Sequence, residues 1–157
     1  MKILLFGEYS GVHTNLRNAL NKKGYEVNAV HNGDSYKSFE ADIFINYKMI
    51  SSNNKIIQSI LELYYLILVY SGFKGIFQIF KYYSTLKSLK GYNVVQLINT
   101  RFLAGFGPIV NFFVFRMLKK NNKKIFLCAL GDDYFWVKYC LEKRFAYSMF
   151  DRLSFKT

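Results

Sequence analysis

The chain has 157 residues, about the length of one domain and enough to bury a hydrophobic core. Hydrophobic residues make up 52% and aromatic residues 19%, which points to covered or membrane-near surface, and the formal net charge of +12 favours anionic partners. Two cysteines are too few for a disulfide framework, and no Cys-x-x-Cys or His/Cys cluster suggests a metal site. We expect Cys128, which lies in an apolar run, to be a buried thiol in a reducing compartment.

The first 30 residues predict a βαβ unit. An apolar run at residues 2–6 predicts a strand buried on both faces; because it follows the first residue directly, we expect no signal peptide and a cytoplasmic protein. A helical pattern at residues 12–20 ends in two lysines and Gly24, which suit the end of a helix. Residues 26–30 predict a second strand, parallel to the first through a right-handed crossover.

Strands and helices continue along the rest of the chain. Polar residues at 51–54 supply a break and a helix cap, and Pro108 suits the first position of a helix whose body is apolar on nearly every side, so that we expect both its faces to be covered. This pattern predicts one α/β domain over residues 1–157, a Rossmann-like open parallel sheet with helices on both faces and strand order 3-2-1-4-5. The further strands are expected at residues 41–47, 92–98 and 125–130, and the further helices at residues 56–89, at 109–118 and from 134.

The helical stretch at residues 56–89 allows two interpretations. Gly72 and Gly75 divide or kink it, and its charge-free part, residues 63–73, is too short to span a bilayer. It is either a crossover helix buried against the sheet or an aromatic and basic surface that lies on an anionic membrane, and both hold if only one half is in the core. The basic turn at residues 119–124 is interpreted as the solvated end of a helix.

Three polar loops are expected to meet at one edge of the sheet. In an open parallel sheet, ligands bind beyond the carboxyl ends of the strands where the strand order reverses, here between the first and fourth strands. The loops that reach this point are residues 7–11, 99–101 and 131–133. Gly7 and Gly11 allow a close approach of the backbone, and the helix behind them favours a phosphate or another anion, unless the segment is only a tight turn.

The side chains of these loops suggest binding roles, each with an ordinary alternative. Arg101 is an anion binder or one half of a surface ion pair, and Asp132 and Asp133 are hydrogen-bonding carboxylates or helix caps. His13 is a catalyst or simply a polar residue in the first turn of a helix. The candidate site residues are Gly7, Glu8, Tyr9, Ser10, Gly11, His13, Asn99, Arg101, Gly131, Asp132 and Asp133.

The glycine loop and the helix and strand after it resemble a known family. Residues 7–16, then Ala19-Leu20 and Gly-Tyr-Glu-Val at 24–27, are similar to the opening of bacterial glycosyltransferases of the two-domain GT-B architecture, of the family-four or group-one type. Residues 129–133, at the end of the fifth predicted strand, are similar to the loop that those enzymes place over the acceptor. Many relatives carry a histidine at the end of that strand, where Leu130 stands here, so no catalytic residue is assigned.

The resemblance implies an enzyme of polysaccharide or glycolipid biosynthesis that transfers a sugar. It implies that the N-terminal domain holds a polysaccharide or lipid-linked acceptor, with residues 131–133 near the acceptor and residues 10–11 near the donor phosphates. The nucleotide sugar is a substrate held by a C-terminal domain, and no cofactor or metal is expected. We therefore expect this chain to be the N-terminal half of such an enzyme and to be inactive without its missing C-terminal domain.

Two other functions compete with this one. A non-catalytic module that binds anionic membranes or ligands would account for the charge and the aromatic residues. Nucleic acid is not expected as a partner, because the basic residues are scattered and form no known motif. The membrane interpretation also implies a peripheral location on the inner face of the cytoplasmic membrane.

Overall fold

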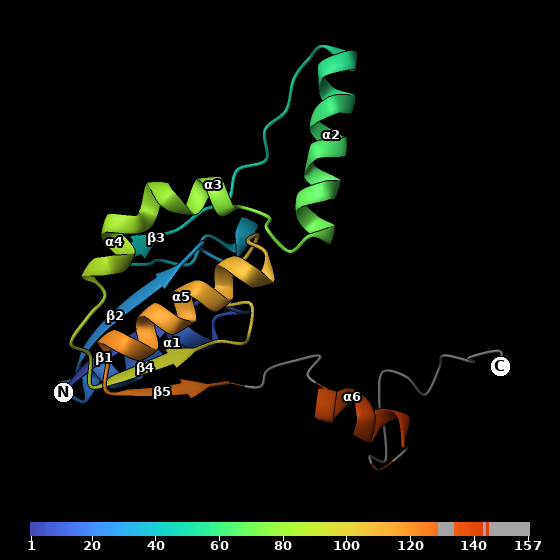
Figure 1. The fold of residues 1–157 in the computed structure, drawn as a ribbon. Coiled ribbons are helices and arrows are strands. Elements are labelled where there is room, and N and C mark those ends of the chain that lie inside the picture. Colours follow the sequence, from blue (N-terminus) through green and yellow to red (C-terminus); the bar gives the residue numbers. More distant parts are fainter. Residues whose placement is uncertain (129–133, 143, 145–157) are drawn as a thin grey trace.

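The computed structural model describes residues 1–128, 134–142 and 144, and its centre is an open sheet with helices on both faces (Figure 1). Every strand pair is parallel, and the strand order is β3-β2-β1-β4-β5. The predicted α/β class, Rossmann-like topology and strand order are therefore confirmed. The strands are β1 (Lys2–Phe6), β2 (Glu26–His31), β3 (Ile43–Phe44), β4 (Val94–Leu97) and β5 (Lys124–Leu127).

The helices connect the strands and cover the two faces of the sheet. Helix α1 joins β1 to β2 and lies on one face of the sheet, whereas α4 and α5 lie on the other. Right-handed crossovers require this arrangement, because β2 and β4 lie on opposite sides of β1. The helices are α1 (Val12–Lys22), α2 (Lys55–Tyr70), α3 (Ile76–Ile79), α4 (Tyr83–Ser88), α5 (Pro108–Asn121) and α6 (Tyr134–Leu141), with 3-10 turns η1 (Ser35–Lys37) and η2 (Phe80–Tyr82).

Alternation along β1 divides the core in two. Leu4 and Phe6 point into the larger cluster, which packs beneath α4 and α5, whereas Ile3 and Leu5 face α1. All four side chains are buried, as predicted for a central strand covered on both faces. Strand β1 ends at Phe6, and the loop of residues 7–11 leaves the sheet there.

Helix α5 differs from the prediction that both its faces are covered. Val110, Val114 and Leu118 are buried against the sheet, but Phe112 and Phe113 are 54% and 58% exposed. The reason is that α5 packs on the sheet with a single stripe of residues four apart, and no described element covers its outer side. An apolar composition on all sides did not mean burial on all sides.

The stretch predicted as helix at residues 56–89 is divided at the two glycines, and only its second part is in the core. Asn54 caps α2 by accepting hydrogen bonds from the amides of Ile56 and Ile57. Leu86 of α4 is buried in the core cluster against the sheet. Helix α2, in contrast, has no buried residue and projects from the body (Figure 1). The buried crossover is therefore confirmed for α4 and wrong for α2.

The edge strands are shorter than predicted. Strand β3 covers only Ile43–Phe44 of the expected residues 41–47, and residues 129–130 of the fifth predicted strand lie outside the described part. Cys128, just past β5, is partly exposed because β5 is the edge strand, so its predicted burial is wrong; Cys140 of α6 is the buried thiol. Among the described residues, no helix is long and apolar enough to cross a membrane.

Candidate functional site

The loops after β1 and β4 touch at the carboxyl edge of the sheet. The register pairs Phe6 with Leu97, so both strands end at the same level. Gly7 has a φ of +84°, and a Cβ there would collide with the side chain of Ile98 and lie 2.8 Å from the carbonyl oxygen of Phe102. Gly7 thus provides both the left-handed turn and the close approach that bring the loop after β1 against Ile98 and Phe102, which flank residues 99–101. Residues 131–133, the third predicted loop, lie outside the described part of the chain.

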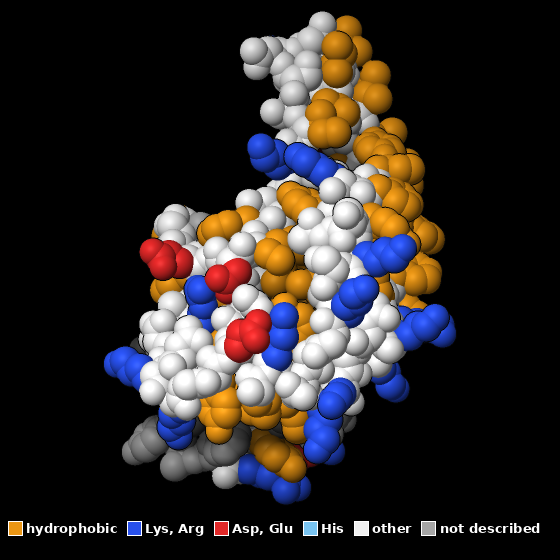
Figure 2. Space-filling view, turned by 90° about the vertical axis from the view of Figure 1, so that its left-hand side faces the viewer, with side chains coloured by type: hydrophobic (Ala, Val, Ile, Leu, Met, Phe, Trp, Pro, Cys, Tyr) orange, Lys and Arg blue, Asp and Glu red, His pale blue; other side chains and the backbone are white. Residues whose placement is uncertain are grey.

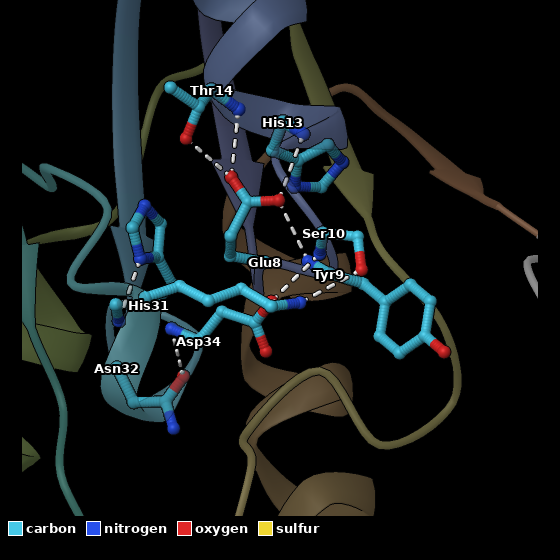
Figure 3. Close-up of polar contacts among 10 residues, drawn as sticks. Glu8, Tyr9, Ser10, His13, Thr14, His31, Asn32 and Asp34 are labelled. Carbon is cyan, nitrogen blue, oxygen red and sulfur yellow. Dashed lines mark hydrogen bonds and ion pairs between the residues drawn. The ribbon is translucent and has the colours of Figure 1, made fainter.

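The anion at the start of α1 is the protein's own carboxylate. Glu8 accepts hydrogen bonds from the amides of Tyr9 (2.7 Å), His13 (3.2 Å) and Thr14 (2.8 Å), and from the Thr14 hydroxyl (2.6 Å; Figure 3). The amide of Val12 donates to the carbonyl of Tyr9. The amides of Val12, His13 and Thr14 therefore already have partners inside the protein and are not free for the phosphate expected at this helix N-terminus.

Hydrogen bonding also fixes the ionisation of Glu8. Burial raises the pKa of this carboxyl, but the hydrogen bonds from Thr14, Tyr9 and His13 favour the charged form and together hold the pKa below its ordinary value. Glu8 is therefore a carboxylate at neutral pH with both oxygens engaged. This arrangement suits a residue that holds the loop in place rather than a general base.

The loop after β2 forms the third side of the site. Asp34 accepts a hydrogen bond from the Ser10 amide (2.8 Å), and the Lys37 ammonium donates to Asp34 Oδ2 (2.9 Å) and to the Ser10 hydroxyl (3.0 Å). Burial raises the pKa of Asp34, but the contacts with Lys37 and with the Ser10 amide outweigh it and lower the pKa. Asp34 and Lys37 therefore hold the loop after β2 against Ser10, which has a φ of +53°.

Two histidines are buried beside Glu8. His13 Nδ1 lies 2.6 Å from the carbonyl oxygen of Gly7, which can only accept, so Nδ1 carries the proton. His31 Nδ1 accepts from the Gly33 amide (3.0 Å), so in the neutral ring Nε2 carries the proton. Burial lowers the pKa of both histidines, and neither Nε2 has a hydrogen-bond partner among the described residues.

The groups that remain open to a ligand are hydroxyls and cations. Tyr9 is about half exposed, and the Ser10 and Lys37 side chains lie beside it in the exposed part of the loop. Asn99 accepts a hydrogen bond from the Arg101 amide, and the exposed Arg101 side chain makes no ion pair with another described residue. Arg101 also lines a cavity of about 730 Å³ between β4, β5 and α5. Such an edge can hydrogen-bond sugar hydroxyls, stack a sugar ring on Tyr9 and attract negative charge.

Several residues of this cluster are absent from the predicted site. Thr14, His31, Asp34 and Lys37 all contribute to it, although none of them lies in the three loops predicted to meet there. The signal that could have found them is the parallel pairing of β1 and β2, because it places residues 31–37 at the same edge as Gly7. His13, expected either as a catalyst or as a polar first-turn residue, is fully buried.

The described part of the chain holds no group of three His, Cys, Asp or Glu side chains arranged to bind a metal ion. Comparisons of the chain with models of known families, with curated proteins and with solved structures found no match.

Proposed function

We propose that this chain is the acceptor-binding domain of a glycosyltransferase of the two-domain GT-B type, with a polysaccharide or lipid-linked acceptor and a nucleotide sugar held by a second domain. The observation that supports the proposal most is the close approach of Gly7 to Ile98 and Phe102, the two residues that flank residues 99–101, at the strand-order switch point. The motif resemblance around this same loop adds to it. The proposal assigns the reaction class and leaves the catalytic residue open.

The open side chains have distinct roles in this proposal. The Tyr9 ring packs against a sugar ring of the acceptor, and the Ser10 hydroxyl and Asn99 amide hydrogen-bond its hydroxyls. Lys37 and Arg101 supply positive charge to the phosphates of a lipid-linked acceptor. Glu8 positions the loop that carries Tyr9 and Ser10 without touching the ligand.

The internal cap on α1 supports an acceptor site over a donor site. A nucleotide diphosphate bound at a glycine loop needs free amides at the helix N-terminus, and here Glu8 takes those of His13 and Thr14. The donor-phosphate contact expected at residues 10–11 is therefore not part of this proposal. Donor binding is left to the second domain.

The test is binding of the 157-residue chain to an array of bacterial oligosaccharides and synthetic prenyl-diphosphate sugars. We expect the chain to bind at least one acceptor, and Tyr9→Ala or Arg101→Ala to weaken that binding about tenfold, since each removes a contact of about 1.5 kcal/mol or more. Tyr25→Ala is the matched control, because Tyr25 is an exposed tyrosine at the opposite edge of the sheet. Equal affinity of Tyr9→Ala and the control variant would contradict the proposal.

The second candidate is a non-catalytic module that binds anionic ligands, favoured by the exposed Arg101 and the net charge of +12. The same array separates the two functions if it also carries prenyl diphosphate without sugar. An acceptor-binding domain discriminates between the forms with and without sugar. Equal binding of both forms supports the anion-binding module.

A further inference from the structure

Helix α2 presents an apolar face that no described element covers. Ile56, Ile60, Leu63, Ile67 and Tyr70 follow one another at the spacing of a single helical face. Their side chains are between 58% and 87% exposed. An isolated apolar residue on a surface is ordinary, but a whole helical face of this kind marks an interaction site.

The base of α2 is rich in tyrosine. Lys74 lies over the rings of Tyr47 and Tyr65, at 4.9 Å and 5.0 Å from their centres. A small cavity of about 80 Å³ opens here between α2 and α3, lined mainly by apolar and aromatic side chains that include Tyr64 and Phe77. Tyrosines beside a lysine are typical of the boundary between hydrocarbon and water in membranes.

The apolar surface continues from α2 onto α5. The amide of Ile109 donates to the carbonyl of Gly72, which joins the end of α2 to the start of α5. Figure 2 shows hydrophobic side chains running from the projecting helix down one flank of the body, with Lys and Arg side chains beside the lower part. After Pro108, the exposed residues of α5 are Phe112 and Phe113, followed by Arg116, Lys119 and Lys120.

Positive charge is concentrated on the same part of the molecule. Residues 43–128 contain twelve Lys and Arg residues and one acidic residue, Glu62, whereas residues 1–42 contain five of each kind. Among the described residues, three ion pairs lie within residues 1–42 and two within residues 138–144, and none involves a cation from residues 43–128. Arg116, Lys119 and Lys120, which follow the exposed phenylalanines of α5, therefore form no ion pair with another described residue.

We propose that α2 and the outer face of α5 dock on a bilayer that contains anionic lipid. The apolar face of α2, with Phe112 and Phe113, enters the interface, and Arg116, Lys119 and Lys120 contact lipid phosphates. At 16 residues α2 is too short to span the hydrocarbon, so it lies in the interface. A second copy of the chain is a poorer occupant, because its basic flank would repel this one.

The test is co-sedimentation of the full chain with vesicles of phosphatidylcholine alone or mixed with phosphatidylglycerol. We expect binding to the mixed vesicles that weakens with salt, and little binding to phosphatidylcholine alone. The double substitution Lys119→Glu and Lys120→Glu should weaken binding about tenfold or more. Its matched control is Lys22→Glu with Lys23→Glu, an exposed lysine pair at the end of α1 in the charge-balanced part. Equal binding of the two variants, or no binding of the unmodified chain, would overturn the proposal.

A second variant tests the apolar contact and the identity of the occupant. Leu63→Gln with Ile67→Gln changes only exposed side chains of α2, so the fold is kept while vesicle binding falls at least about tenfold. If the variant instead abolishes a dimer seen by light scattering and binds vesicles as before, α2 is a contact between copies and the proposal is wrong. The vesicles carry no sugar, so this result is independent of the acceptor-binding test.

Discussion

At the residue scale, Glu8 is the side chain on which the site loop depends most. Glu8→Ala removes four hydrogen bonds and leaves the His13 and Thr14 amides without partners. We expect the free energy of unfolding, measured in urea, to fall by about 2 kcal/mol. Glu26→Ala is the control, because it breaks only an exposed pair with Lys2 and should cost less than about 0.5 kcal/mol. Equal losses in the two variants would contradict the capping role.

The buried histidines predict a dependence of stability on pH. Burial lowers the folded-state pKa of His13 and His31, so the unfolded chain takes up more protons below its ordinary histidine pKa of about 6.5. The free energy of unfolding should therefore fall as the pH drops through about 6.5, and the lowered pKa of Glu8 adds a loss of the same sign in more acidic solution.

Urea unfolding at about pH 7.5 and about pH 5 measures this dependence. In the double variant His13→Asn with His31→Asn, the first asparagine can donate to the Gly7 carbonyl and the second can accept from the Gly33 amide, as the two Nδ1 atoms do. Neither asparagine titrates. The double variant should lose most of the difference between the two pH values. An unchanged difference in that variant would show that other groups cause it.

At the element scale, the contact between the β1 and β4 loops can be measured with two glycines. Gly7 and Gly24 have nearly the same φ, +84° and +81°, but only at Gly7 would a Cβ meet other atoms, those of Ile98 and Phe102. Gly24→Ala should cost about 1 kcal/mol of backbone strain, and Gly7→Ala about 3 kcal/mol, because it also separates the loops. Similar costs for both variants would mean that the two loops do not touch.

Helix α2 and helix α4 should contribute differently to stability. Leu86→Ala in α4 leaves a cavity in the core and should lower the free energy of unfolding by about 3 kcal/mol. Leu63→Ala in α2 removes an exposed side chain and should change it by less than about 0.5 kcal/mol. Urea denaturation of both variants checks this contrast, and a large loss from Leu63→Ala would mean that α2 is packed in solution.

At the scale of the whole molecule, the sheet was predictable and the coverage of its helices was not. Apolar runs bounded by glycines indicate strands, and the handedness of crossovers limits the strand order, so β1 and its neighbours could be placed from local sequence. The exposure of α2 could not, because an apolar helix has the same pattern in a core and at an interface. The capping role of Glu8 depends on how the chain turns at Gly7, which the residue pattern does not specify.

The proposed division of labour also predicts what the chain does alone. Mixed with nucleotide sugars and an acceptor that it binds, it should transfer no sugar, because the donor is held by a second domain in the proposed enzyme. Release of free nucleotide, followed by chromatography, measures this. Turnover by the 157-residue chain alone would contradict the assignment of donor binding to another domain.

The most direct test of the acceptor site is a titration of the isotope-labelled chain with a bound acceptor sugar, followed through its amide NMR signals. The shifts should concentrate in residues 7–11, 31–37 and 99–101, which meet at one edge of the sheet. Shifts concentrated at the opposite edge, around Tyr25 and Gly91, would show that the sugar binds elsewhere and would contradict the proposed function.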